Sequence, residues 1–459
     1  MYSRLLNILL FLIVSCVFPL HAQDGSGYTN NLSPSIYKGS DQNWDAVQDT
    51  IGKMYFANLN GVIIYDGRFW KTLRLANNAS AFSLDKDNND KIYVGGDNEF
   101  GYITNKTSGA YDYVSLSSQL PVKEKDFTIT WSTYCIGNDV FFCSNKKLFY
   151  YNKKTVKSFT PEGSAFHTFF KVGKHLFVRE FDKGFKVFEN GQLSFVKGSE
   201  EFADKKVYAI LNLEANTYIV ATRHDGIYLL YYNDKNPSKS IFVRKPSPID
   251  DWLKENDLYC GARVGDNKYA FGSLKGGVIF TDGALKVVSK LNSNNGLQDD
   301  AVKNIFLDSN ENLWLSLNFG ITFFENNTPI TFWKKTEGIK GVVENVIKFK
   351  GNTFVATDKG LLKLNESSSK FEETQITAEC YSMTSSKDNL FIASSEGLYL
   401  FDGTNYNLVS EEFTYSVFYD SYRNYLYVGT DNNFYKGILD KKKFNLPNYG
   451  KNNIRKIDK

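Results

Sequence analysis

Residues 302–324 read VKNIFLDSNENLWLSLNFGITFF, and this stretch decides the fold. Three short apolar segments, 302–307, 313–317 and 321–324, are separated by the polar turn 308–312 and by a second turn that ends in Gly320. Asp, Asn and Ser close tight turns with their own side chains. Residues 330–332 (ITF) can add a fourth strand, so this part of the chain predicts one four-stranded unit.

The same pattern recurs ten times along the chain. In each copy an aromatic residue stands near the start of an apolar strand, and a small residue, a polar turn and another apolar strand follow. The spacing between successive aromatic residues averages about 41, which is the period of a propeller blade. No long apolar pattern of 3.6-residue period appears, so few helices are expected. The aromatic residues are Tyr55, Tyr93, Phe141, Phe177, Tyr218, Tyr269, Trp314, Phe354, Phe391 and Tyr427.

Four-stranded units at this period predict an all-β fold of the β-propeller type. A β-solenoid is the alternative, although its repeats are usually shorter. Ten units exceed the roughly eight blades that one ring usually holds. We therefore expect a first propeller of about seven blades in residues 43–336, after an N-terminal lead-in at 23–42. Residues 337–459 are expected to form an incomplete second propeller of about three blades and a stub.

Composition supports a globular β-protein and narrows the range of partners. The 459 residues include 54 basic and 51 acidic side chains, and this near-balance argues against a nucleic-acid partner. Aromatic residues make up 16% of the chain, and they favour half-buried pleated surfaces.

The first 22 residues resemble a targeting segment. Arg4 precedes a mostly apolar run at 5–20, and Leu-His-Ala at 20–22 resembles a cleavage site before Gln23. We expect residues 1–22 to be a secretory signal peptide and the mature protein to be periplasmic. Two alternatives are a lipoprotein anchored at Cys16, which ends a lipobox-like segment, and an uncleaved anchor. No later segment has the 18 uncharged apolar residues of a membrane span.

Four cysteines remain after the targeting segment: Cys135, Cys143, Cys260 and Cys380. Cys135 and Cys143 flank the turn at 137–139, so a disulfide between neighbouring strands is one interpretation. The other is that all four are small buried hydrophobic residues.

Two stretches of the sequence resemble a known family. One is 296–321, with GLQDDAV at 296–302 and NLW at 312–314; the other is 42–67, with QNW at 42–44, YFAN at 55–58 and YDG at 65–67. They resemble the two-component regulator propeller repeat and the start of exported sensor-regulators built on that repeat. The resemblance extends over essentially all of the chain after residue 22.

The resemblance implies an extracytoplasmic sensor made of one or two propellers. In that family a triple-tyrosine β-sandwich, a membrane helix and a cytoplasmic histidine kinase or helix-turn-helix regulator usually follow, and many members are thought to sense glycan fragments. This sequence contains none of those later modules. We therefore interpret it as a truncated copy, a fragment or a free periplasmic receptor.

The sequence offers no catalytic or metal-binding motif. His167, His175 and His224 lack metal-ligand spacing, and no nucleophile, phosphate-loop or Cys-x-x-Cys motif occurs. The acidic stretches 85–90 and 308–312 resemble calcium loops but lack the Gly and the distal Glu of an EF-hand. We expect no catalytic residue, no metal and no cofactor.

The turns between second and third strands are the candidate ligand site, because they share one rim of a propeller with the connections between blades. Charged and amide side chains near aromatic residues there suit a sugar or a carboxylate ligand. The candidate residues are Asp97, Asn98, Glu99, Arg179, Glu180, Asp182, Arg223, His224, Asp225, Asp431 and Asn432.

The sequence thus predicts an exported, non-enzymatic sensor that binds an oligosaccharide or another small molecule. The expected further partner is a membrane-bound signalling protein or a second copy of the chain. A periplasmic protein-interaction scaffold and a propeller hydrolase or lyase are the alternatives.

Overall fold

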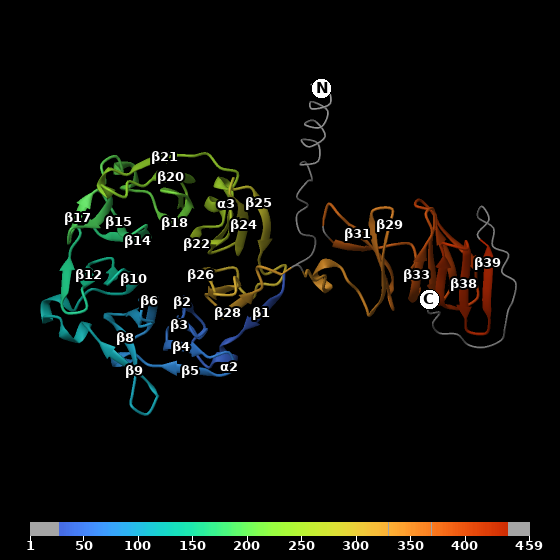
Figure 1. Ribbon diagram of the computed structural model, residues 1–459, viewed down its shortest axis with the longest axis horizontal. Coiled ribbons are helices and arrows are strands. Elements are labelled where there is room, and N and C mark those ends of the chain that lie inside the picture. Colours follow the sequence, from blue (N-terminus) through green and yellow to red (C-terminus); the bar gives the residue numbers. More distant parts are fainter. Residues whose placement is uncertain (1–26, 329, 369, 439–459) are drawn as a thin grey trace, which may run out of the picture. The chain divides into compact units, whose positions relative to one another are not determined.

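The computed structural model describes residues 27–328, 330–368 and 370–438. These residues form two compact units that divide after Ile330 (Figure 1). Both units consist almost entirely of antiparallel sheets, so the predicted all-β propeller fold is confirmed. The expected signal peptide 1–22 with Cys16, and the expected stub within 439–459, lie outside the described residues.

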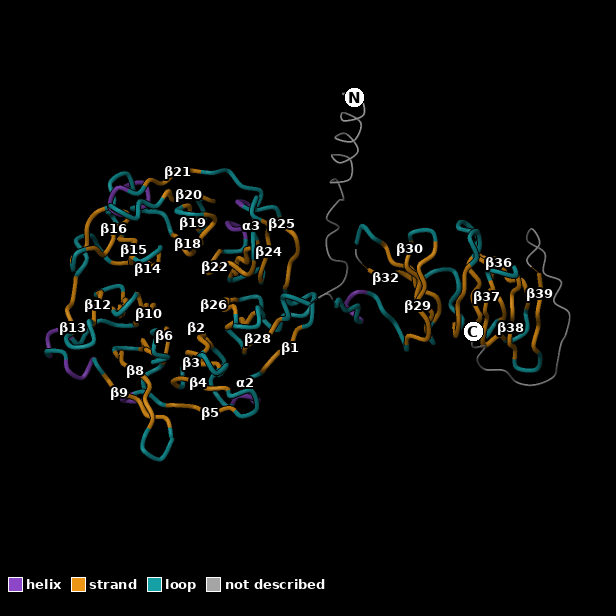
Figure 2. Tube along the Cα trace, in the orientation of Figure 1, coloured by secondary structure: helices purple, strands orange, loops and turns teal. Residues whose placement is uncertain are grey.

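The first unit contains seven four-stranded sheets, here called blades one to seven, arranged around a common axis (Figures 1 and 2). The first strand of each blade is innermost, and first strands of adjacent blades pack against each other around the whole ring. The strands of blades one to six are β2–β5 (Asn43–Gln48, Met54–Asn58, Gly61–Tyr65, Trp70–Leu73), β6–β9 (Ala81–Lys86, Ile92–Gly96, Glu99–Asn105, Tyr111–Ser115), β10–β13 (Thr130–Ile136, Asp139–Ser144, Leu148–Tyr151, Val156–Phe159), β14–β17 (Phe166–Val172, His175–Glu180, Gly184–Glu189, Gln192–Phe195), β18–β21 (Val207–Glu214, Thr217–Thr222, Ile227–Tyr231, Ile241–Arg244) and β22–β25 (Leu258–Gly265, Lys268–Ser273, Val278–Asp282, Val287–Leu291).

Blade seven is built from both ends of the first unit. Its inner strands are β26–β28 (Val302–Leu307, Leu313–Leu317, Ile321–Phe324), and its outermost strand is β1 (Thr29–Leu32), which pairs with β28 in antiparallel register. The expectation of a fourth strand at 330–332 is therefore wrong, and part of the expected lead-in 23–42 belongs to a blade. Nearly the whole length of the unit separates β1 from its partner, so closure of the ring joins its two ends.

In blades one, two and seven the recurrent aromatic residue is held by an aspartate six positions before it. Asp308 Oδ1 accepts hydrogen bonds from the backbone N–H of Asn310 and Asn312, while its Oδ2 accepts one from Trp314 Nε1 at 3.1 Å. The same arrangement joins Asp49 to Tyr55 and Asp87 to Tyr93. One carboxylate thus closes the turn between first and second strands and also fixes the aromatic ring.

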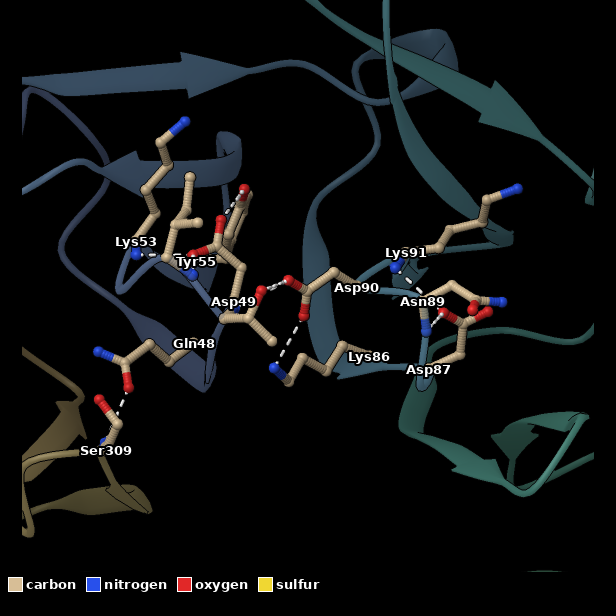
Figure 3. A network of polar contacts seen from close by, with 12 residues as sticks. Gln48, Asp49, Lys53, Tyr55, Lys86, Asp87, Asn89, Asp90, Lys91 and Ser309 are labelled. Carbon is tan, nitrogen blue, oxygen red and sulfur yellow. Dashed lines mark hydrogen bonds and ion pairs between the residues drawn. The ribbon is translucent and has the colours of Figure 1, made fainter.

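These turns also connect neighbouring blades (Figure 3). Gln48 Oε1 of blade one accepts a hydrogen bond from Ser309 N of blade seven at 2.8 Å. Asp90 of blade two accepts one from Thr50 N of blade one at 2.9 Å and pairs with Lys86. The acidic stretches that resembled calcium loops are therefore occupied by backbone amides and lysines of the protein itself.

The core lies between blades, where aromatic rings from adjacent sheets meet. Phe56 of blade one lies 5.5 Å from Trp314 of blade seven, and Phe100 of blade two stacks on Phe142 of blade three at 4.5 Å. Phe56, Phe100 and Phe142 are fully buried. The high aromatic content of the chain therefore fills the wedge-shaped spaces between blades.

The four cysteines among the described residues form no disulfide. Cys135 lies opposite Val140, and Cys143 lies opposite Ser132, so the two thiols are out of register on β10 and β11. They also pack into different hydrophobic clusters. The interpretation of Cys135 and Cys143 as a bonded pair is therefore wrong, and both are buried hydrophobic residues.

The second unit contains two four-stranded sheets and one three-stranded sheet among the described residues. Its strands are β29–β32 (Val343–Phe349, Asn352–Thr357, Gly360–Asn365, Lys370–Glu373), β33–β36 (Cys380–Ser385, Leu390–Ser394, Gly397–Phe401, Tyr406–Ser410) and β37–β39 (Thr414–Asp420, Tyr425–Thr430, Phe434–Ile438). Helices are short throughout: α2 (Pro34–Tyr37), α3 (Asp250–Glu255) and the 3-10 turns η1–η6 (Ala76–Asn78, Ser117–Gln119, Val122–Glu124, Glu200–Phe202, Pro237–Lys239, Lys335–Glu337).

Candidate functional site

Each innermost strand of the first unit has a β-bulge at its second residue. In β2 the pairing register passes from Asn43 to Asp45 and leaves Trp44 without a partner across the ladder. A bulge re-aims the unpaired side chain, and here the same position is re-aimed seven times. We call the seven bulged residues the bulge cluster; they are Trp44, Phe82, Trp131, His167, Tyr208, Tyr259 and Lys303.

The side chains of the bulge cluster converge at the axis of the ring. Trp44 of blade one lies 5.6 Å from Trp131 of blade three, although blade two stands between these blades. Phe82 of blade two completes the group, with ring centroids 5.2 Å from Trp44 and 5.4 Å from Trp131. Contact across a blade is feasible only near the centre, so this aromatic trio occupies one side of the axis.

The other side of the axis combines aromatic rings with cations. Tyr208 and Tyr259 stack at 5.4 Å, and His167 lies edge-on to Tyr208 at 5.5 Å. Arg223, from the turn between β19 and β20, covers the Tyr208 ring at 4.2 Å. Lys303 Nζ lies 5.0 Å from the Tyr259 ring and 4.9 Å from the Trp44 ring, and so joins this side to the aromatic trio.

Burial and charge set the ionisation of this region. Burial, with Arg179, Lys206 and Arg223 nearby, lowers the pKa of His167 to about 3, so the imidazole is neutral at physiological pH. Burial also lowers the pKa of Lys303, and the repulsion from Arg223 acts in the same direction. Except for Phe82, which is 8% exposed, the cluster is partly accessible to solvent. The cluster is therefore a partly exposed aromatic surface with fixed positive charge.

Two carboxylates follow the bulges of blades one and two. Asp45 accepts hydrogen bonds from the backbone N–H of Ala46 and, in the next blade, Leu84, both at 2.8 Å. Asp85 likewise accepts one from Cys135 N of blade three at 2.7 Å. Burial, with the Asp85 charge as a smaller contribution, raises the pKa of Asp45 to about 7. Both groups connect adjacent blades through hydrogen bonds to backbone amides.

Most of the predicted site residues lie at the expected turns, whereas Arg179 and Glu180 end β15 and Glu99 begins β8. Few of the predicted residues reach the bulge cluster. Arg223 is the clearest member, through Tyr208. Arg179 is fully buried at the end of β15, where it donates to the carbonyls of Phe202 and Ala203 and stacks on Phe181, which contacts His167 at 4.8 Å.

Four others are engaged in structural contacts. Glu99 is buried and accepts hydrogen bonds from Tyr113, Ser115 and Ser117. Asn98 Oδ1 accepts from the N–H groups of Phe127 and Thr128. Buried Glu180 pairs with Lys186 at 2.9 Å, and His224 pairs with Asp257 at 3.1 Å. Arg179, Glu180 and Glu99 are therefore buried within the protein.

The remaining predicted residues lie at turn surfaces. Asp97 and Asp225 donate backbone hydrogen bonds within the rim, and Asp182 accepts one from Ser164 N at 3.2 Å. Asp431 and Asn432 belong to the second unit, beside a partly exposed group of Phe413, Tyr381 and Tyr415. Tyr381 and Tyr415 are the bulged residues of β33 and β37, so these first strands of the second unit have the same β-bulge as those of the first unit.

Sequence reasoning missed the bulge cluster, although a signal for it exists. Each bulged residue lies ten or eleven positions before the recurrent aromatic residue of its blade, as Trp44 precedes Tyr55 and Tyr259 precedes Tyr269. The position varies between aromatic, His and Lys, so the pattern is weak in any one repeat. The role of this position depends on the β-bulge, and the bulge is seen only in the pairing register of the first and second strands.

Two surface hollows, one in each unit, are not lined by residues of the bulge cluster. One of about 740 Å³ in the second unit is lined by polar residues including Lys363, Glu372 and Glu373. In the described part of the chain, no group of three or more His, Cys, Asp or Glu side chains is arranged to hold a metal ion. None of the helices within the described ranges has the length and apolar character that a membrane crossing requires.

Comparison with known proteins supports the fold. No family model matches the chain, and no curated protein matches it. The extracellular domain described as that of a hybrid two component system from B. thetaiotaomicron, BT3049, matches at TM-score 0.65 and 15% identity, over 92% of this chain and 60% of that one. The extracellular domain described as that of the one component system BT4673, from the same organism, matches at TM-score 0.50 and 15% identity, over 90% and 66%.

A more distant propeller also matches. The WD40 β-propeller domain of Doa1 has a TM-score of 0.50 at 12% identity, over 66% of this chain and 97% of that one. The chain spans 60% and 66% of the length of the two extracellular domains. At these identities the similarity establishes a shared propeller fold.

Proposed function

We propose that this chain is an exported, non-enzymatic sensor propeller that binds a glycan fragment or a similar solute at the bulge cluster. The observation that carries the proposal is the convergence of one bulged residue from every blade on the axis of the ring, where Trp44 and Trp131 meet across an intervening blade. Partly exposed aromatic faces bind the apolar faces of sugar rings, and neighbouring polar groups orient the ligand.

Two further observations support this proposal. The solved structures that share the propeller over most of this chain are extracellular domains of signalling systems. Near the axis, Asp45 and Asp85 are committed to backbone amides rather than to each other as an acid–base pair. The proposal includes export by the signal peptide 1–22, or lipidation at Cys16, and relay of the signal through a membrane-bound partner or a second copy of the chain.

Calorimetric titration of the purified chain with a panel of oligosaccharides tests the proposal. We expect saturable binding without turnover of the ligand, and we expect Trp131→Ala to weaken binding about tenfold or more, because loss of one stacking ring costs roughly 1–2 kcal/mol. Phe69→Ala is the control, since Phe69 is a 57% exposed ring in the turn between β4 and β5, away from the innermost strands. Equal weakening by both variants, or product formation from the bound glycan, would contradict the proposal.

A further inference from the structure

Three cations at the bulge cluster lack an acidic partner. No carboxylate of the described residues lies within ion-pair distance of Arg179, Arg223 or Lys303. The nearby acids lie farther away or are engaged elsewhere. Asp299 accepts a hydrogen bond from Ala301 N, and Asp257 pairs with His224 and Lys275. Asp182 and Asp204 act on Arg179 from beyond ion-pair distance. Among the described residues, the three cations at this end of the axis therefore have no carboxylate in direct contact.

Two of these cations flank one ring. The Arg223 guanidinium lies 6.0 Å and Lys303 Nζ lies 5.0 Å from the centroid of Tyr259. Each charge disfavours the other, and holding two unpaired cations together in a partly buried place is costly. An anion that entered between them would remove that cost, because charge-assisted hydrogen bonds to guanidinium and ammonium groups are strong.

Arg179, the third cation, adds to the positive electrostatic potential at the bulge cluster. Arg179 is fully buried, and its Nη1 has no hydrogen-bond partner, while Nε and Nη2 are both satisfied by carbonyls. A buried donor without a partner is uncommon in proteins and calls for an explanation. Its charge acts on His167, which itself belongs to the bulge cluster.

We propose that the bulge cluster is selective for an anionic sugar, whose carboxylate or sulfate group lies between Arg223 and Lys303 over Tyr259 and whose ring face lies on Trp44 and Trp131. Lys303 contacts both Tyr259 and Trp44, so the charged group and the stacking surface are one side chain apart. This inference rests on the proposed function and adds to it the chemical class of the ligand.

Matched pairs of glycans that differ only in charge test the inference. The probes are tetragalacturonate and a hyaluronan tetrasaccharide, each beside its carboxyl-reduced form, and a chondroitin sulfate tetrasaccharide beside its desulfated form; cellotetraose and xylotetraose are neutral references. Calorimetry on the mature chain at about 50 mM and 200 mM salt gives Kd for each. We expect at least one acidic member to bind about tenfold or more tightly than its neutral form, with weaker binding at the higher salt concentration.

Charge variants locate the effect. Lys303→Gln and Arg223→Gln should each weaken the acidic ligand about tenfold more than they weaken its neutral form, whereas Lys303→Arg should retain most of the affinity for the acidic ligand. Lys183→Gln is the matched control, because Lys183 is exposed on the corresponding turn of blade four and has no contact with the cluster. Thermal melting checks that each variant is folded, and the two Gln variants serve as independent tests.

The outcomes distinguish selectivity for anionic glycans from glycan binding as such. Equal affinity for acidic and neutral forms, or binding of neutral glycans alone, overturns the anionic selectivity and leaves the proposed sensor function standing. Acidic binding that Lys183→Gln weakens as much as Lys303→Gln also overturns it, since the effect would then be general surface charge. If no glycan of either kind binds the folded chain, both the inference and the proposed glycan site fail.

Discussion

The two units are built from the same repeat but differ in how far the faces of their sheets are buried. In the first unit both faces of every blade are covered by neighbours, and Phe177 and Val178 on successive positions of β15 are both fully buried. In the described part of the second unit, β29 leaves Val343 46% and Val346 59% exposed. The comparison teaches that the repeat specifies a blade, whereas closure of a ring needs additional contacts that are not part of the repeat.

The closing contacts combine buried aromatic packing, such as that of Phe56 on Trp314, with a short strand ladder and hydrogen bonds of amide side chains. Four residue pairs join β1 to β28, and the Asn31 side chain adds hydrogen bonds with Gly296 and Thr322. Inside the ring, Asn43 Nδ2 donates to Gly320 O of blade seven at 3.0 Å, and its Oδ1 accepts from Asn58 at 2.9 Å. Breaking these contacts should make the first unit behave like an open row of sheets.

Removal of residues 29–32 should have the largest effect. The variant loses a four-residue ladder, and at about 1 kcal/mol for each backbone hydrogen bond the free energy of unfolding of the first unit should fall by about 4 kcal/mol. Urea titration followed by tryptophan fluorescence measures this change. Deletion of residues 107–108, in the exposed hairpin loop of blade two, is the matched control and should cost about 1 kcal/mol or less, because three residues still connect the paired Asn105 and Tyr111. Equal losses in the two variants would show that β1 does not close the ring.

Asn43→Ala should have a smaller effect, because it breaks the closure at one point. The side chain is fully buried, and its removal leaves Gly320 O and Asn58 Nδ2 without this partner. We expect a loss of about 2–3 kcal/mol in the free energy of unfolding. Asn60→Ala, an exposed amide in the same blade, should change the value by less than about 0.5 kcal/mol. A loss below about 1 kcal/mol for Asn43→Ala would argue against this bridge.

The smallest effect should be a pH dependence that the closed ring imposes on Asp45. Burial raises the pKa of this carboxyl from 3.8 to about 7, so the folded state holds the proton more tightly than the unfolded chain does. Its contribution to stability is therefore complete below about pH 4 and is lost as the pH rises to about 7.

Comparison with Asp45→Asn isolates that contribution. The stability of the wild type relative to the variant should fall by about 1–2 kcal/mol between pH 4 and pH 8, less than the full shift would give because the side chain is partly accessible. Denaturant titrations at several pH values measure this difference, with Asp251→Asn on exposed helix α3 as the reference. A difference that stays constant with pH, or rises, would refute the assignment.

Much of the fold could be predicted because it depends on local chemistry. In three blades the recurrent aromatic residue, as at Trp314, is hydrogen-bonded to an aspartate of its own turn, so the hairpin is specified locally. Strand β1 could not be found in this way. Its sequence, TNNL, has no apolar alternation, and its partner lies almost 300 positions away.

The site was less predictable because it depends on register and on convergence. The turn between β19 and β20 points to Arg223, which contacts Tyr208 of the bulge cluster. Glu99 and Glu180 are predicted on the same grounds, yet Glu99 accepts a hydrogen bond from Ser117 and Glu180 pairs with Lys186 inside the protein. His167 lacks any metal-ligand spacing, and only the bulge in β14 directs it toward the axis.

The bulges have a consequence for how such a chain can change over time. A bulged residue has no partner across the ladder, so its replacement leaves the register of the strand intact. The seven positions already hold Trp, Phe, His, Tyr and Lys on the same backbone geometry. Selection could therefore rewrite recognition one blade at a time, with each substitution tested separately while the scaffold beneath it stays the same.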